Sequence, residues 1–323
     1  MKVLLITCLS LILYCNVSVA QTPVAVNGAL SIKNNRIVNQ QGIDPQLHGI
    51  SLSWSIWQGQ KFYTPAVVDW LVSDFKISIL RVAMAVQPDS GYLQQPDRQL
   101  KLVQSVIDEA IKDGIYVLID WHDHHSNMHV AESKAFFAMM AKKFIGVPNV
   151  IYEIWNEPEA ISWDTVKNYA LQVIPEIRKY DTNNLVVVGS PHWDQDVDVA
   201  AADPIMGYNN IAYSFHFYAS DPNHQQGLRD KADIAIKKGL PIMVTEWGVG
   251  EASGDGKFDK DEVKIWMNWL KANKLSWANW NITDKHETTA LLLPGASVNG
   301  GWTTDQLTPA GNYIREQIRK QVK

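Results

Sequence analysis

Eight short apolar segments constrain the fold of this 323-residue chain more than any other feature of its sequence. Each is rich in Val, Ile, Leu or aromatic residues and lacks a regular alternation with polar residues. They lie at residues 47–54, 79–86, 116–122, 150–156, 185–190, 211–218, 241–247 and 276–282. A strand that is buried on both faces of a parallel sheet has this pattern. We therefore predict eight strands of a parallel sheet.

Longer amphipathic stretches follow most of these segments and predict helices, for example at residues 97–113, 162–180, 259–273 and 309–321. Eight strand–helix units in about 300 residues favour an α/β fold with a single (β/α)8 TIM barrel over a doubly wound sheet. Residues 30–32 and 37–39 flank Asn34 and Asn35 and predict a small N-terminal β-hairpin cap. No linker or short repeat interrupts residues 21–323, so we predict one catalytic domain there.

The start of the chain has the pattern of a secretory signal peptide. Lys2 precedes an apolar run at residues 3–14, and small residues occupy the cleavage positions before residue 21. A signal anchor is the alternative, although the run is too short to span a bilayer. We therefore expect removal of residues 1–20 and a secreted, extracellular protein with no membrane attachment. Cys8 and Cys15 lie in this segment, so the remainder contains no cysteine and no disulfide framework.

The charge balance argues against one large class of partners. The chain has 29 Lys and Arg, 34 Asp and Glu, and a net charge of -5, with no stripe of basic residues that could contact a phosphate backbone. We expect no nucleic-acid partner. With 46% hydrophobic residues, the chain can form a large packed core without disulfides.

Two glutamates fall at predicted strand ends, where TIM barrels have their active sites. Glu157 follows the fourth strand, and Glu246 lies at the end of the seventh. Two carboxyl groups about 5 Å apart are the equipment for glycoside hydrolysis with retention, because one donates a proton while the other attacks as an anion. Either residue considered alone could also be a surface carboxylate or a member of a structural ion pair.

Arg81 on the second strand needs an anionic partner inside a barrel. Glu246 is one candidate, and Arg81 would then keep that carboxylate ionised. Glu153 is the other candidate, because it shares strand parity with Glu157 and also points inward. The sequence leaves both pairings open.

Histidines gather at the end of the third strand, at residues 120–125. A zinc site is one interpretation, but neighbouring strand residues face opposite ways and no helical pair of histidines supports the site. We favour His122 as a neutral hydrogen-bonding group in the barrel mouth. His124, His125 and His129 are predicted to be loop residues.

Aromatic residues also gather at the strand ends. His216 and Tyr218 share one face of the sixth strand. Seven tryptophans lie at or just beyond strand ends: Trp54, Trp57, Trp121, Trp155, Trp193, Trp247 and Trp280. Flat indole faces among carboxylates, Asn, His and Lys suit a sugar, whose C–H faces stack while its hydroxyls need donors and acceptors. These residues predict a carbohydrate cleft.

With these residues in place, the chain resembles glycoside hydrolase family 5, and within it the endo-β-1,4-glucanases (cellulases). The similarity runs from about residue 28 to the C-terminus and includes Trp-Asn-Glu-Pro at residues 155–158 and Thr-Glu-Trp-Gly at residues 245–248. The resemblance implies that Glu157 is the acid/base and Glu246 the nucleophile. It further implies that Asn156 binds the substrate 2-hydroxyl, and that Arg81 and Tyr218 keep the nucleophile ionised and oriented.

The same resemblance implies roles for further residues along the cleft. His122 and His216 would line the reacting subsite. The glycone-side contacts would be Trp280, Lys285 and Glu287, and the more distant stacking platforms would be Trp57 and Trp193.

The activity implied is hydrolysis of internal β-1,4 bonds of cellulose, a β-glucan polysaccharide, with retention and with no metal or organic cofactor. We expect a monomer, and we expect the charge of Glu246 to raise the pKa of Glu157. Three alternatives remain: the same mechanism on mannan, xyloglucan or mixed-linkage glucan, a barrel that binds sugar without catalysis, and a metal-dependent hydrolase.

Overall fold

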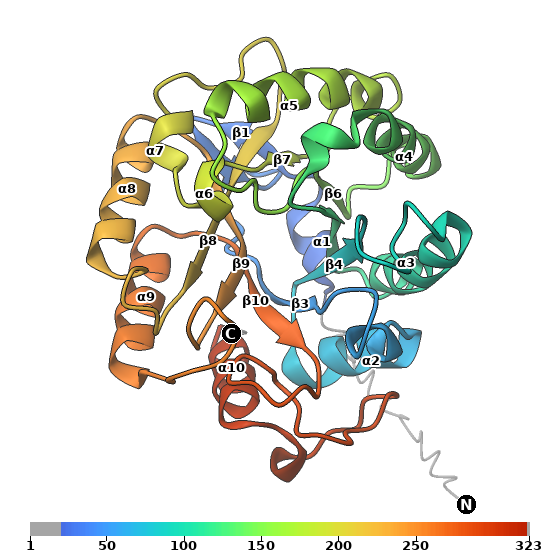
Figure 1. The fold of residues 1–323 in the computed structure, drawn as a ribbon, viewed down its shortest axis with the longest axis vertical. Helices are drawn as coiled ribbons and strands as arrows, with labels where there is room; N and C mark the ends of the chain where they lie inside the picture. Colours follow the sequence, from blue (N-terminus) through green and yellow to red (C-terminus); the bar gives the residue numbers. More distant parts are fainter. Residues whose placement is uncertain (1–20, 322–323) are drawn as a thin grey trace, which may run out of the picture.

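A closed barrel of eight parallel strands forms the centre of the protein (Figure 1). The computed structural model describes residues 21–321; the predicted signal segment, residues 1–20, lies outside them. Around the barrel the strands follow in sequence order, with β10 closing against β3. Their bounds are β3 His48–Leu52, β4 Ile79–Ala85, β5 Tyr116–His122, β6 Val150–Glu153, β7 Val186–Val188, β8 Ile211–Tyr218, β9 Ile242–Gly248 and β10 Trp277–Ile282. The predicted TIM barrel is confirmed.

Helices surround the strands as an outer layer (Figure 1). The longer ones are α3 Pro96–Lys112, α4 Val130–Lys143, α5 Trp163–Arg178, α8 Gln226–Lys237, α9 Lys260–Ala272 and α10 Pro309–Arg319. Shorter ones are α1 Pro23–Asn27, α2 Pro65–Trp70 with a π-helical turn at Leu71–Phe75, α6 Pro191–Asp194 and α7 Val197–Ala200. Short 3-10 turns lie at Gly59–Phe62, Ser126–Met128 and Thr304–Gln306. Within residues 21–321 no helix is long and apolar enough to cross a membrane.

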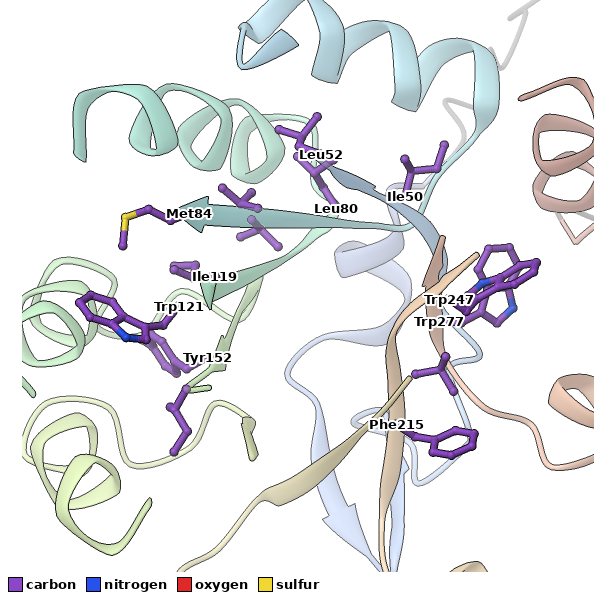
Figure 2. Packing of buried hydrophobic residues seen from close by; sticks show 14 of the residues in the cluster. Ile50, Leu52, Leu80, Met84, Ile119, Trp121, Tyr152, Phe215, Trp247 and Trp277 are labelled. Atoms are coloured by element: carbon purple, nitrogen blue, oxygen red, sulfur yellow. The ribbon is translucent and has the colours of Figure 1, made fainter. Parts of the chain in front are cut away.

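Alternate residues of each strand face the helices or the barrel interior. On β5, Val117, Ile119 and Trp121 belong to the large core between strands and helices, whereas Tyr116 and Leu118 belong to a separate interior cluster. Figure 2 shows part of the large core, where side chains from several strands pack outward. Both faces of the strands are thus apolar in their first half, which explains why the sequence shows no polar alternation.

The barrel interior contains apolar side chains at its N-terminal end and charged side chains toward its C-terminal end. A hairpin of β1 (Ser31–Lys33) and β2 (Arg36–Val38) confirms the predicted cap. Its turn residues Asn34 and Asn35 both have positive φ, the conformation of a tight two-residue turn. Ile37 of the hairpin packs in the interior cluster with residues at the starts of β4 and β5. Because this end is closed by apolar residues, polar side chains can collect only toward the opposite, C-terminal end.

Candidate active site

Arg81 is the hub of the ionic layer inside the barrel and is fully buried. Its Nε lies 2.7 Å from Glu153 Oε2, its Nη1 lies 2.7 Å from Glu246 Oε2, and its Nη2 lies 2.9 Å from Asp120 Oδ2. Nη2 also donates to Asn156 Oδ1 at 2.6 Å. The two pairings that the sequence left open are therefore both present, with a third from Asp120. One guanidinium fork satisfies four acceptors, which come from β5, from β6 and its end, and from β9.

Glu153 is the permanently ionised member of this layer. Burial opposes its charge, but Arg81 and the nearby His216, whose Nε2 lies 3.8 Å from Glu153 Oε1, outweigh burial and lower the pKa of Glu153 to about 2. Its carboxylate therefore balances the Arg81 cation at every pH in the ordinary working range. Its buried position leaves it a structural partner rather than a group that meets a ligand.

Glu246, on β9, has a donor on each carboxylate oxygen. Tyr218 Oη donates to Oε1 at 2.7 Å, and Arg81 Nη1 donates to Oε2 at 2.7 Å. These bonds fix the direction of the carboxylate and favour its charged form. Burial, followed by the nearby charge of Glu157, nevertheless raises the pKa of Glu246 above the ordinary value of 4.5. Glu246 is therefore an oriented carboxylate that loses its proton at a higher pH than a surface glutamate does.

Glu157 lies just past β6 and faces Glu246 across the mouth. Its backbone is in the left-handed region, with φ of 53°, which is unusual for a residue other than glycine. One carboxyl oxygen of Glu157, one of Glu246 and one ring nitrogen of His216 lie within 4.8 Å of one another. This spacing fits the separation of about 5 Å used for retention and is too short for the water that inverting enzymes place between their carboxyl groups.

His216 changes the expected protonation of Glu157. Its Nδ1 lies 3.0 Å from Glu157 Oε1. Burial opposes a charge on His216, but Asp194, Glu153 and Glu157 outweigh it and raise the pKa of His216 well above its ordinary value. Burial acts on Glu157 in the other direction, yet the hydrogen bond and charge of His216 lower the pKa of Glu157. We expected Glu246 to raise it; the difference arises because a cation binds Glu157 directly, so the proton is shared by the Glu157–His216 pair.

His122 is a neutral member of the mouth. Burial, followed by the charge of Arg81, lowers the pKa of His122 well below its ordinary value. Its Nδ1 lies 2.7 Å from Asp120 Oδ2, and its ring stacks on Trp280 at 5.5 Å between centroids. Trp54 meets the same ring edge-on at 4.1 Å. The ring is thus fixed in a polar and aromatic wall.

The cleft consists of two hollows that share His124, Glu157, Tyr218 and Ala252. The first hollow is also lined by six of the site residues predicted from the sequence: Trp57, His122, Glu246, Trp280, Lys285 and Glu287. Lys285 Nζ and Glu287 Oε2 form an ion pair of 2.6 Å there. The second hollow contains Trp193 and His216. Trp57 and Trp193 are 62% and 41% exposed, as flat platforms for a ligand must be.

Three of the strand-end tryptophans do not belong to the cleft. Trp121, Trp155 and Trp247 are fully buried in the core between strands and helices. Figure 2 shows Trp121 on one side of that core and Trp247 beside Trp277 on the other. They lie at strand ends but on the outward face of the strands. Position at a strand end therefore does not predict a place in the cleft unless strand parity is also considered.

Sequence reasoning missed two residues beside Glu157. His124 is a loop residue, as predicted, but its Nδ1 lies 4.0 Å from Glu157 Oε2 and its ring stacks on Trp54. Asp194 is fully buried, and its Oδ2 lies 3.5 Å from His216 Nε2. The repeated His and Asp around residues 120–125 was a usable signal for His124. Asp194 had none, because its position depends on a loop conformation.

Comparisons with known proteins relate the chain to one family of enzymes. The family model described as cellulase (glycosyl hydrolase family 5) matches residues 38–286. Endoglucanase N of Pectobacterium atrosepticum is 41% identical over 94% of this chain and 68% of its own length. Endoglucanase A of Evansella cellulosilytica is 43% identical over 86% of this chain and 57% of its own length. The chain thus spans between about half and two thirds of these relatives.

Solved structures show the same fold. A protein from Cytophaga hutchinsonii superposes with a TM-score of 0.90 and is 44% identical, covering 93% of this chain and 97% of that one. A catalytic-domain variant of endoglucanase Cel5A from Thermobifida fusca, in complex with cellotetraose, gives a TM-score of 0.87 at 30% identity, covering 93% and 100%.

Proposed function

Because the chain belongs to glycosyl hydrolase family 5, we propose that it is an endo-β-1,4-glucanase that cleaves internal bonds of cellulose with retention at the anomeric carbon. The observation that carries the proposal is the spacing of Glu157 and Glu246, whose facing oxygens lie within 4.8 Å. The oriented Glu246 carboxylate suits the role of nucleophile. Glu157 suits the role of acid/base, because the adjacent His216 holds a proton that it can pass to Glu157 and is the proton store of the site.

In the first step Glu246 attacks the anomeric carbon as the bond to the leaving sugar breaks. The glycosidic oxygen takes the proton of Glu157, and a glycosyl ester forms on Glu246. Arg81 and Tyr218 hold the attacking carboxylate in one direction. In the second step water attacks the same carbon, Glu157 accepts its proton, and the ester bond to Glu246 breaks. Two inversions give net retention.

The proton for the first step comes from the Glu157–His216 pair. In the free site His216 binds the proton and Glu157 is its anionic partner. Bound sugar removes water from Glu157, which disfavours its charge and raises its proton affinity. The proton then moves over the existing hydrogen bond to Glu157 Oε1. No step requires a metal or an organic cofactor.

The cleft supports a chain-like glucan as the substrate. Trp57, Trp280 and Trp193 present aromatic surface on both sides of Glu157. Asn156 Nδ2 has no hydrogen-bond partner among residues 21–321, but Asn156 is fully buried and lines neither hollow, so its contact with a sugar hydroxyl stays a prediction. The named relatives are endoglucanases, and one similar structure contains cellotetraose. We also propose that the enzyme is secreted after loss of residues 1–20 and acts as a monomer.

Reducing-sugar release from carboxymethylcellulose, galactomannan, xyloglucan and mixed-linkage glucan tests the substrate. We expect carboxymethylcellulose to be cleaved about tenfold faster, or more, than galactomannan or xyloglucan. A difference of about 1.4 kcal/mol in transition-state binding is enough to produce a tenfold difference in rate. A fall in viscosity that precedes most reducing-sugar release would show internal cleavage. Preference for mannan or xyloglucan would overturn the substrate, and no release from any polymer would favour a binding protein.

A further inference from the structure

The loop that follows β7 contacts the backbone of the acid/base segment at successive residues. His192 N–H donates to the carbonyl of Glu159 at 3.0 Å, and Trp193 N–H donates to the carbonyl of Pro158 at 2.8 Å. Asp194 completes the series, because its Oδ2 accepts from Glu157 N–H at 3.3 Å. Every residue from Glu157 to Glu159 therefore has a hydrogen-bond partner on this loop.

The loop has an unusual conformation that places Asp194 at this position. His192, Trp193 and Asp194 all have positive φ, of 53°, 55° and 60°. Three consecutive left-handed residues are costly for ordinary side chains, because Cβ crowds the following carbonyl oxygen, although Asp tolerates the conformation better than most. Asp194 Oδ1 accepts from Ser190 N–H at 2.5 Å and so closes the turn.

The turn also packs tightly against the end of β6. A side chain at Gly189 would place its first carbon 2.8 Å from the Trp155 carbonyl oxygen and 2.9 Å from Asp194 Oδ1. Glycine is required here for close approach. The Asp194 carboxyl is consequently enclosed, with no exposed surface, between the turn and the segment that bears Glu157.

Asp194 also contacts the proton store of the site. Its Oδ2 lies 3.5 Å from His216 Nε2, on the side of the ring opposite to Glu157. The charged groups that face Asp194 are His216 from β8 and Glu153 and Glu157 from β6 and its end. Those that face His216 are the same two glutamates, Asp194, Glu246 from β9, and Asp120 and His122 from β5. The hydroxyl of Thr245 also hydrogen-bonds His216 Nε2 at 2.8 Å. Asp194 is thus the one group in the described residues that contacts both the Glu157 backbone and the His216 ring.

We propose that Asp194 is a positioning residue for the acid/base: it fixes the left-handed backbone of Glu157 and, through His216, retains the proton that Glu157 delivers. The inference rests on the proposed hydrolase function and deepens it. Asp194 does not touch the substrate, and its effect is transmitted by one hydrogen bond to a backbone and one contact to a ring.

The pH dependence of this role follows from burial. Burial raises the pKa of Asp194 to about 7. Below that pH the carboxyl is neutral; above it, the anion raises the proton affinity of the Glu157–His216 pair. An Asp194→Asn variant lacks the anion, so the pair should lose its proton at lower pH than in the wild type. The alkaline limb of kcat/KM should move to lower pH, while the acid limb, which reports Glu246, should stay in place.

The test compares Asp194→Asn and Asp194→Ala with the wild type on two substrates. Cellotetraose has a leaving group that needs a proton, whereas dinitrophenyl β-cellobioside has one that does not. For Asp194→Ala we expect kcat/KM on cellotetraose to fall about 10- to 100-fold, because a small displacement of an acid has that effect. On the dinitrophenyl substrate kcat/KM should stay within about threefold.

Asp196→Asn is the matched control, because it removes a carboxylate from the same loop. Asp196 pairs with Lys231 at 2.6 Å and with His192 at 2.5 Å, and it contacts neither Glu157 nor His216. Its kinetics and pH profile should match the wild type. If Asp194→Ala does not fold, the pH profile of Asp194→Asn still tests the positioning role, because Asn tolerates the left-handed backbone.

Equal losses on both substrates together with an unshifted alkaline limb in Asp194→Asn would overturn the positioning role and leave the hydrolase intact. Wild-type activity on neither substrate would instead overturn the proposed function, and this inference with it.

Discussion

Replacement of Glu246 by Gln should lower kcat on carboxymethylcellulose by about 10⁴-fold or more, or about 5.5 kcal/mol of activation free energy. Gln has nearly the same shape and can still accept a hydrogen bond from Tyr218 or Arg81, but it cannot form the glycosyl ester. The fold should persist, because Arg81 keeps its contacts to Glu153 and Asp120. Binding of cellotetraose, measured by calorimetry, should change by less than about tenfold.

Glu316→Gln is the control for this substitution, since Glu316 lies on the surface of α10, is 61% exposed and, within residues 21–321, forms an ion pair only with Lys320. Its activity should equal that of the wild type. If Glu246→Gln kept about a tenth or more of the wild-type turnover, Glu246 would not be the nucleophile.

Replacement of Glu157 by Gln should lower kcat/KM on cellotetraose by about 10²- to 10⁴-fold, the usual contribution of a general acid. On dinitrophenyl β-cellobioside kcat/KM should change little, because that leaving group departs without a proton. The second step lacks its base in the variant, so the glycosyl-enzyme should accumulate and kcat should fall.

Azide provides the internal control for Glu157. As an anionic nucleophile it needs no base, so it should restore kcat of Glu157→Gln on the dinitrophenyl substrate and give β-cellobiosyl azide. It should do nothing for Glu246→Gln. An equal loss on both substrates without azide rescue would assign Glu157 a structural role.

The positions of the eight strands followed from the sequence, because strands buried on both faces lack polar alternation, but their bounds followed only in part. The segment at residues 211–218 matches β8 at both ends, whereas the segment at 185–190 exceeds β7 by one residue at its start and two at its end. The excess residues, Gly189 and Ser190, belong to the turn that carries Asp194. An apolar pattern cannot distinguish a strand from the bend that ends it.

Residue type and strand position predicted which side chains face the barrel mouth. The distances between these side chains could not be predicted from the sequence. Strand parity placed Glu153 in the interior and strand-end position placed Glu246 in the mouth, but only the structure shows that the Arg81 guanidinium reaches both glutamates. The prediction that all strand-end tryptophans line the cleft was wrong where strand parity was not applied. Trp247 lies next to Glu246 in sequence and therefore on the opposite face of β9. His216 was placed in the mouth, but its contact to Glu157 depends on the left-handed backbone of Glu157, which no sequence pattern encodes.

Proton NMR of the first products of cellotetraose hydrolysis tests the central claim most directly, because the spacing of Glu157 and Glu246 specifies the stereochemistry. The account predicts that the new reducing end appears first as the β-anomer and reaches the α/β equilibrium only later by mutarotation. Initial release of the α-anomer would contradict it, because inversion requires a water between carboxyl groups that the structure places too close together.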